Sequence, residues 1–321
     1  SQVSELVARV KAAHPGDIAL TEALAVGQSL INEKRFAEAA EVFGAVLDKN
    51  PTEPVALYGA ALSAFNLGKT SEAESLARAA VAATTSGSSD VPSNKMSKEK
   101  TRATDALVLL AIVLAVRGDD PGALKSAQQA VRIAPDHFDA QFTLGRALYS
   151  VGDMSAAVKA FRVAVSLNPS DARALFFLGT TLERAGDLES ALNTYRQLIA
   201  KRPNAAQGHL GVGTVLVRRG GTQMEEGIEA LKRAVTLEPD LYEARVALGR
   251  ALVSKGRAGE SLEHLIRASE LAPRNPEPQY QLSLAYRRLR QYDKAAEATA
   301  AVKRIHESRR ASRAPRKSSE T

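Results

Sequence analysis

The sequence of 321 residues is 45% hydrophobic and 25% charged, a composition typical of a folded soluble protein, and it holds no run of about 18 apolar residues that could cross a membrane. Cysteine is absent, which excludes disulfides, thiolate metal sites and a cysteine nucleophile. The net charge of +7 is concentrated in residues 303–321, which hold seven basic and two acidic side chains, so the rest of the chain is nearly neutral.

Residues 1–19 include the segment SELVARVKAAHPGD, whose apolar residues recur at helical spacing. We expect one helix here that caps the first end of the structure that follows. Ser1 fits either a removed signal peptide or an arbitrary starting point, and a lack of cysteine is easier to explain in an exported protein. We therefore favour a soluble protein that is exported, periplasmic or extracellular, over a cytoplasmic one.

From about residue 20 onward the sequence repeats itself. The stretch LGRALYSVGDMSAAVKAF begins at Leu144, and related stretches begin at Leu178, Val212 and Leu248, at intervals of 34, 34 and 36 residues. A fixed period of roughly 20 to 50 residues indicates stacked supersecondary units rather than one closed core. Within a unit, apolar residues recur at i, i+3, i+4 and i+7 through two segments of about a dozen residues, which predicts a pair of amphipathic helices.

Small and helix-breaking residues occupy the same places in each unit. A glycine between the two helices permits the left-handed conformation that ends the first helix, and a proline after the second helix sets the boundary of the unit. A further small residue in the first helix lets neighbouring helices approach closely. The turn glycines are Gly68, Gly118, Gly152, Gly186, Gly220 and Gly256; the prolines are Pro51, Pro135, Pro169, Pro203, Pro239 and Pro273; the small first-helix residues are Gly27, Ala61, Ala111, Gly145, Gly179, Gly213, Gly249 and Ser283.

This pattern resembles the tetratricopeptide repeat family. The matching residues are LG-x2-L from Leu144 to Leu148, A-x3-F from Ala157 to Phe161, and the closing proline. The resemblance implies an all-α fold, a right-handed superhelical solenoid of stacked antiparallel helix hairpins. It covers most of the chain, in eight units that start near residues 20, 54, 104, 138, 172, 206, 242 and 276.

The units divide the chain into five segments. A capping helix over residues 1–19 precedes units one and two at 20–83, and units three to eight occupy 104–309. Between them, residues 84–103 are rich in Ser, Gly and Lys, and we expect an inserted polar loop, or else a segment that folds on binding. Residues 310–321 form a basic tail, which we expect to be disordered in isolation.

No constellation of residues points to catalysis or to a cofactor. The five histidines lie in different units with no pair at i, i+4, whereas a metal site needs convergent ligands. The segment GHLGVG from Gly208 lacks the preceding strand and the lysine of a phosphate loop, so close helix packing explains its glycines better. We therefore expect a non-enzymatic protein without metal or cofactor.

The resemblance also implies a binding surface, because in this family the first helix of each unit lines the concave face. In the first three units this face is expected to be apolar, and from the fourth unit onward arginines with aromatic neighbours are expected there. The alternative is that the arginines only solvate an exposed helix face. The apolar residues are Leu24, Tyr58, Leu62, Phe65, Val108 and Ile112; the second set is Phe142, Arg146, Tyr149, Phe176, Phe177, Arg184, Arg218, Arg250, Tyr280, Arg287 and Arg288.

These features predict a non-enzymatic protein-protein interaction scaffold that binds a peptide segment or a partner protein in the concave groove. Arginine captures carboxylates in a bidentate manner, so an acidic segment is expected along units four to eight. The alternative function is a self-assembling structural subunit, since solenoids that stack through a non-closing contact form filaments. Specific nucleic-acid binding is disfavoured because the aromatic residues are not interleaved with the charges of the tail.

Overall fold

The structure, a computed structural model, describes residues 2–13, 18–85 and 93–313, and these residues form α-helices and one 3-10 turn without any strand. The helices are α1 (Gln2–Ala12), α2 (Ile18–Asn32), α3 (Phe36–Lys49), α4 (Pro54–Asn66), α5 (Thr70–Thr85), α6 (Ser93–Val116), α7 (Asp120–Ile133), α8 (Phe138–Val151), α9 (Met154–Leu167), α10 (Ala172–Arg184), α11 (Leu188–Lys201), α12 (Ala206–Arg219), α13 (Met224–Leu237), α14 (Tyr242–Ser254), α15 (Ala258–Leu271), α16 (Pro276–Arg288) and α17 (Tyr292–Arg313), and the 3-10 turn is η1 (Gly221–Gln223).

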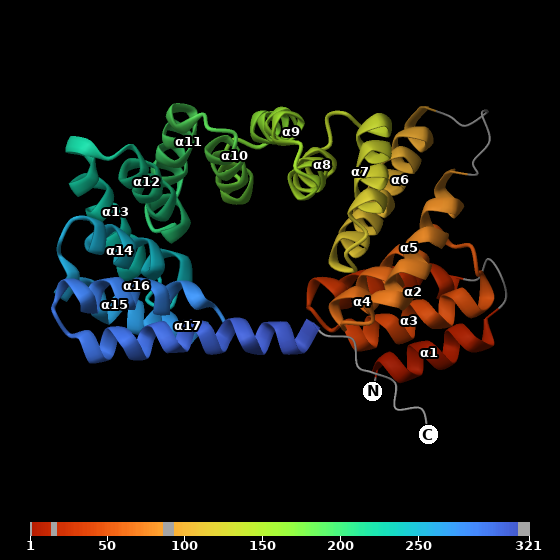
Figure 1. Cartoon of the computed structure of the whole chain (residues 1–321). Helices are drawn as coiled ribbons and strands as arrows, with labels where there is room; N and C mark the ends of the chain where they lie inside the picture. The colour runs from red at the N-terminus through yellow and green to blue at the C-terminus, as the bar shows by residue number, and fades with distance from the viewer. Residues whose placement is uncertain (1, 14–17, 86–92, 314–321) are drawn as a thin grey trace, which may run out of the picture. The chain divides into compact units, whose positions relative to one another are not determined.

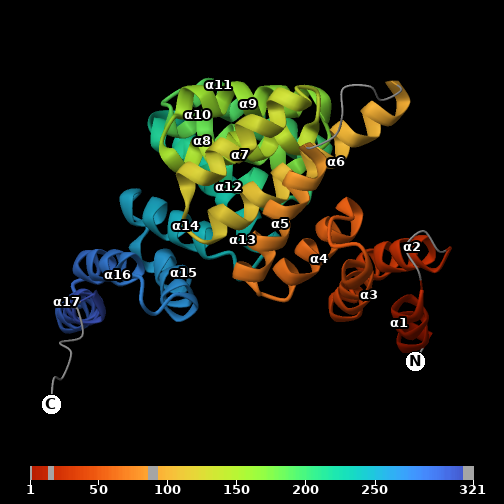
Figure 2. The same cartoon turned by 90° about the vertical axis from the view of Figure 1, so that its right-hand side faces the viewer.

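The helices pair into antiparallel hairpins, from α2 with α3 to α16 with α17, which confirms the all-α repeat fold (Figure 1). Two compact units divide the chain: Ser1–Pro169 holds α1 to α9, and Ser170–Thr321 holds α10 to α17. From here on, the first unit and the second unit mean these two compact halves of the chain, and a single repeat is called a hairpin. In the first unit α1 packs against α2 and α3, as a capping helix would (Figure 2).

Three expected boundaries differ from the structure. The N-terminal helix ends at Ala12, and α17 continues to Arg313, so the first residues of the predicted tail are helical. Residues 93–103 of the predicted polar loop form the first turns of α6, while residues 86–92 and 314–321 lie outside the described part of the chain. The segment MSKEKTRA within α6 is polar, but Met, Lys, Glu, Arg and Ala are also good helix formers.

The hairpin turns follow from the glycine and the residue after it. Gly152 and Gly186 both have a φ of 87°, in the left-handed region that suits a residue without Cβ. Asp153 and Asp187 follow them, and each side chain accepts a hydrogen bond from a backbone N–H of the next helix, at 3.0 and 3.1 Å respectively. The acidic residues at these turns are therefore helix caps.

Aromatic rings from second helices fill the spaces that the small first-helix residues leave. The ring of Tyr195 on α11 lies against Gly179 of α10 and Gly211 of α12, where an added Cβ would overlap it. The ring of Phe43 on α3 lies in the same way against Gly27 and Gly59. Each ring therefore joins two successive hairpins, and glycine provides the room.

The first helices form the inner layer of the second unit. Successive first helices contact one another from α10 to α16, whereas the described residues of α11, α13 and α15 share no such contacts. Because the first helices are closer together, the stack curves with these helices on the inside. The inner face therefore presents α10, α12, α14 and α16.

Candidate functional site

A hollow of about 380 Å³ lies on this inner face, and we call it the inner hollow. It lies across α10, α12 and α14, with Tyr195 from α11 and two residues at the start of α16. Its walls are largely apolar, and its ionisable groups comprise several acids and one arginine. The lining residues are Phe176, Thr180, Glu183, Tyr195, Leu210, Gly211, Thr214, Tyr242, Glu243, Val246, Ala247, Arg250, Asn275 and Glu277.

Glu183, from α10, is the half-buried acid at one end of the inner hollow. Tyr195 Oη donates a hydrogen bond to Glu183 Oε2 at 3.4 Å, and the hydroxyls of Tyr195 and Thr180 lie 3.1 Å apart. Burial raises the pKa of Glu183, and the positive charges of Arg218 and Arg250 oppose that effect. The arginines of α12 and α14 therefore offset only part of the cost of burying the Glu183 carboxylate.

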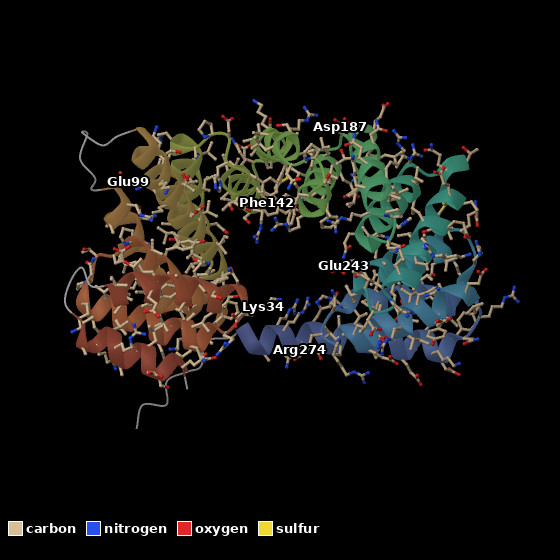
Figure 3. All side chains as sticks on the ribbon, turned by 180° about the vertical axis from the view of Figure 1, so that it is seen from behind. Lys34, Glu99, Phe142, Asp187, Glu243 and Arg274 are labelled. Atoms are coloured by element: carbon tan, nitrogen blue, oxygen red, sulfur yellow. The ribbon has the colours of Figure 1, made fainter. Side chains whose placement is uncertain are left out.

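Tyr242, at the start of α14, is different because its hydroxyl oxygen is buried without a hydrogen-bond partner among the described protein atoms. Burial raises the pKa of Tyr242, and the nearby carboxylates of Glu277 and Glu243 raise it further. These two acids lie at the starts of α16 and α14, and Figure 3 shows the position of Glu243. This end of the inner hollow is therefore acidic.

The two acids differ in what they contact. Gln281 Nε2 donates to Glu277 Oε1 at 2.9 Å, and the Asn275 side chain caps α16 by accepting from the backbone N–H of Glu277 at 3.1 Å. Glu243 is exposed and makes no ion pair within the described residues. With three carboxylates and one guanidinium among its lining residues, the inner hollow carries a net negative charge.

The structure places only part of the expected basic surface at the inner hollow. Phe176 and Arg250 line it, and Arg218 lies at its edge, where Nη1 donates to the backbone oxygen of Glu183 at 3.3 Å. Phe177 packs edge-on against Phe176, with ring centroids 5.8 Å apart. The remaining members from the second unit are exposed and do not line it: Arg184, Tyr280, Arg287 and Arg288.

In the first unit, two expected surface residues belong to the core instead. Phe142 is 6% exposed, because its ring stacks on Phe138 and meets Phe161 edge-on. Val108 is also buried, in a cluster between neighbouring hairpins. The assignment of these two side chains to the surface was wrong, because Phe138 of the same helix and Phe161 of α9 cover the Phe142 ring, and residues of α7 and α8 pack on Val108.

The other expected residues of the first unit are exposed or half-buried. Arg146 is exposed and Tyr149 half-buried on α8. The expected apolar residues pack against buried clusters, so they contribute to the contact between hairpins as well as to the surface. Its half-buried members are Leu24, Tyr58, Leu62, Phe65 and Ile112.

Sequence reasoning missed Glu243 and Glu277 as site residues. Both are the second residue of a repeat, as Asp105 and Asp139 are in the first unit. Aligning the repeats would therefore have shown that this position is acidic in four of them. It was missed because acids in the first turn of a helix are expected for the helix dipole without any further role. In the first unit, His137 Nε2 lies 3.4 Å from Asp105 Oδ1, and burial raises the pKa of that carboxyl.

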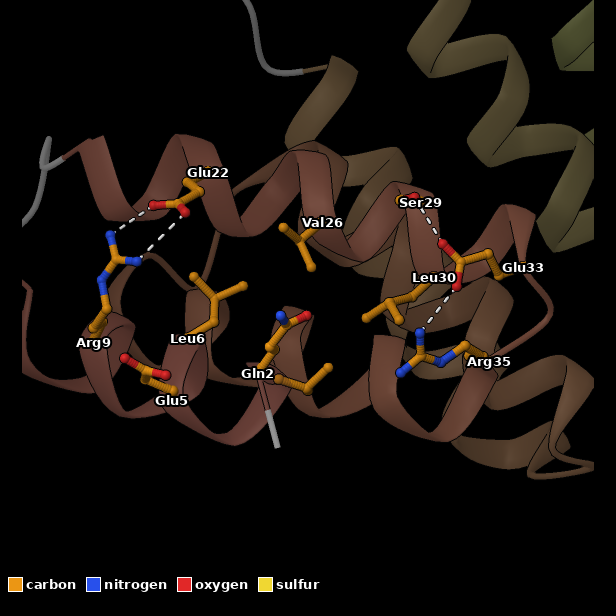
Figure 4. A pocket seen from close by; sticks show the side chains of 11 residues that line it. Gln2, Glu5, Leu6, Arg9, Glu22, Val26, Ser29, Leu30, Glu33 and Arg35 are labelled. Carbon is orange, nitrogen blue, oxygen red and sulfur yellow. Dashed lines mark hydrogen bonds and ion pairs between the residues drawn. The ribbon is translucent and has the colours of Figure 1, made fainter.

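A second hollow, of about 670 Å³, lies between α1, α2 and the start of α3 in the first unit (Figure 4). At one end Arg9 bonds to Glu22 at 2.7 Å. At the other end Glu33 accepts from Arg35 at 3.0 Å and from the Ser29 hydroxyl at 3.1 Å. The charged side chains at both ends pair with one another within the hollow. We therefore interpret this hollow as a groove left by helix packing.

Neither a metal site nor a membrane span is found in the described part of the chain. No group of three or more His, Asp or Glu residues there could hold a metal ion. None of its helices is long and apolar enough to cross a membrane.

Comparison with known proteins links the hairpins to one family. A family model described as tetratricopeptide repeat matches residues 24–88, 142–206, 178–241, 221–276 and 246–309. No curated protein matches the sequence.

Solved structures are similar in fold. A tetratricopeptide repeat protein from Parabacteroides merdae has a TM-score of 0.60 at 14% identity, over 83% of this chain and 98% of that one. The pilF protein of Pseudomonas aeruginosa has a TM-score of 0.56 at 17% identity, over 65% and 94%. YrrB, described as a TPR protein with an unusual peptide-binding site, has a TM-score of 0.44 at 21% identity, over 57% and 93%. At these identities the likeness extends to the fold alone.

Proposed function

The chain belongs to the tetratricopeptide repeat family, and from this membership we propose that it is a non-enzymatic scaffold that binds a segment of a partner protein at the inner hollow of the second unit. The observation that carries the proposal is the hollow itself, which spans three successive first helices. Apolar walls with a few converging polar groups are typical of ligand sites. Phe176 and Val246 supply apolar contact area, and Arg250 and Glu243 supply charge.

The arginines extend the proposed contact beyond the inner hollow. Arg184 ends α10, and Arg287 and Arg288 end α16, all three exposed to solvent. Guanidinium groups bind carboxylates in a bidentate manner, so we propose that the bound segment carries acidic residues where it passes them. Arg218 contributes less to this contact, because its Nη1 already donates a hydrogen bond to the backbone oxygen of Glu183.

Peptide selection tests the proposal. A display library of random 12-residue peptides is panned against the full chain, and the affinity of the selected peptides is measured by fluorescence anisotropy. We expect Arg250→Glu to weaken binding at least tenfold, because Arg250 lines the inner hollow. Arg233→Glu on α13 is the matched control, because Arg233 is exposed and lies away from the hollow. Equal affinity for both variants and the wild-type chain would rule out the inner hollow as the binding site.

Self-association is a second candidate function. In the first unit Leu67, Val116 and Val151 stay 41%, 60% and 43% exposed, one at the end of the first helix of each of three successive hairpins. Such an apolar row would lose water contact if a second copy covered it. Sedimentation velocity tests this: Val116→Lys should lower the sedimentation coefficient of an assembly, and a wild-type chain that stays monomeric at high concentration contradicts it.

A further inference from the structure

At the acidic end of the inner hollow, the carboxylates lack the nearby positive charges that Glu183 has at the other end. Glu183 has the charges of Arg218 and Arg250 nearby, together with the hydroxyl of Tyr195. Glu243 has no ion pair within the described residues, and the Glu277 carboxylate accepts a hydrogen bond from the neutral amide of Gln281. Two carboxylates therefore line a largely apolar hollow without an ion pair to any described residue.

The hydroxyl of Tyr242 adds a polar atom that is equally uncompensated. It is buried and makes no hydrogen bond to the described protein atoms, although buried polar groups are normally paired. Both carboxylates lie close enough to act on this hydroxyl, since each of them raises the pKa of Tyr242. Tyr242, Glu243 and Glu277 thus lie in one neighbourhood of the inner hollow.

The walls next to these groups restrict what could satisfy them. Leu210, Val246 and Ala247 give an apolar surface that suits an aliphatic stem. A carboxylate would meet Glu243 and Glu277 as like charges, and a purely apolar side chain would remove them from water without a partner. A metal ion is not favoured, because no group of three possible metal ligands occurs among the described residues. A long side chain with a cationic end satisfies both the walls and the charges.

We propose that the inner hollow recognises a lysine or arginine side chain of the bound segment, with its stem along Val246 and its cationic end between Glu243 and Glu277. The Tyr242 oxygen accepts one of the hydrogen bonds that the cation donates. The inference rests on the proposed function, because it names the residue that the bound segment inserts. The segment therefore carries mixed charge, with a basic residue in the hollow and acidic residues toward Arg184, Arg287 and Arg288.

A positional-scanning library of nine-residue peptides tests this with the full chain. One position at a time is fixed as Lys, Arg, Glu or Leu, and binding is measured by fluorescence anisotropy. We expect one position at which Lys and Arg bind at least tenfold better than Glu and Leu. The double variant Glu243→Gln and Glu277→Gln should abolish that preference while peptides with Leu at that position still bind, because both changes retain side-chain size.

Two control variants sharpen the result. Glu297→Gln, on the exposed face of α17, should leave the preference unchanged. Glu243→Lys should shift the preference toward Glu, because it reverses the charge at that end of the hollow. Circular dichroism of each variant shows that the helices are retained.

The outcomes separate the two proposals. If no library peptide binds the wild-type chain, the proposed function and this inference both fail. If peptides bind without a preference for Lys or Arg, or if the preference survives the double variant, the inference fails while peptide binding stands.

Discussion

The ring of Tyr195 on α11 occupies the space that a side chain at Gly179 on α10 would fill, since an added Cβ would lie 2.6 Å from Tyr195 Cε1. Tyr195 is 1% exposed, and its ring also lies against Gly211 of the next hairpin. The hydroxyl of the same residue reaches Glu183 in the inner hollow. Tyr195 therefore connects the packing of the repeats with the position of a charged group on the inner face.

We expect Gly179→Ala to destabilise the chain by about 1–3 kcal/mol, because the added methyl overpacks a filled site. Urea unfolding followed by circular dichroism measures this. Gly259→Ala in α15 is the matched control: no neighbouring atom lies within 4 Å of the position that a Cβ would take there, so the change should be neutral or stabilising by about 0.5–1 kcal/mol. Equal effects at the two sites would contradict the packing role of Gly179.

Lys34 takes the turn position that glycine holds in most hairpins, and its φ is 62°. We expect Lys34→Gly to stabilise the first hairpin by about 1 kcal/mol, because a side chain in the left-handed region costs about that much. Gln28→Gly, at an exposed site within α2, should instead destabilise by about 1 kcal/mol. Thermal unfolding distinguishes the two, and a loss of stability in both variants would show that Lys34 is unstrained.

Tyr242→Phe removes a buried hydroxyl that has no described partner, so the free energy of unfolding should stay equal or rise. The same change should weaken binding of Lys-containing peptides severalfold. Tyr195→Phe is the contrast, because its hydroxyl contacts Thr180 and Glu183; we expect a loss of about 0.5–1.5 kcal/mol. A loss of stability in Tyr242→Phe comparable to that in Tyr195→Phe would show that the Tyr242 hydroxyl is paired.

The raised pKa of Glu183 has a defined effect on stability. Its folded pKa lies above the ordinary value of 4.5, so the folded chain holds the proton more tightly than the unfolded chain. The stability from this group is fully present below the unfolded pKa and is lost as pH rises through the folded pKa. Glu183→Gln should therefore be more stable than the wild-type chain at neutral pH.

The advantage of Glu183→Gln should shrink as pH falls through the folded pKa and disappear below the unfolded value of 4.5, where the carboxyl is protonated in both states. Urea unfolding of both chains at several pH values measures this difference in free energy. Glu297→Gln on α17 controls for the loss of one negative charge. An advantage that grew on acidification would contradict the cause assigned to the pKa shift.

Local patterns were sufficient for most of the fold. The hairpin turns needed only the recurring glycine and the capping residue after it, and both act within a few residues of sequence. The start of α6 was missed because the segment before Thr104 was interpreted by its polarity, although its residues favour a helix. The helix at that point follows from the helix propensity of these residues, which their polarity does not reveal.

The candidate site was predicted less completely than the fold. Phe176 and Arg250, which the repeat register predicted on the inner face, line the inner hollow. The register placed Phe142 on that face too, although Phe161 of α9 meets that ring edge-on, in addition to Phe138 one turn earlier on α8. A register position gives the direction of a side chain from its own helix, but it does not give what the neighbouring helices place over it.

The sequence by itself determined the repeat and the hairpins, because these follow from periodicity and from residues close together in the chain, whereas the inner layer of first helices was implied by the resemblance to the tetratricopeptide repeat family. Only the tertiary structure decided which charges are balanced. Arg218 and Arg250, which come from two other hairpins, offset part of the charge of Glu183, while Glu243 and Glu277 both lie near Tyr242 and form no ion pair within the described residues. Coulomb interactions depend on distance through space, and stacking of the hairpins sets that distance.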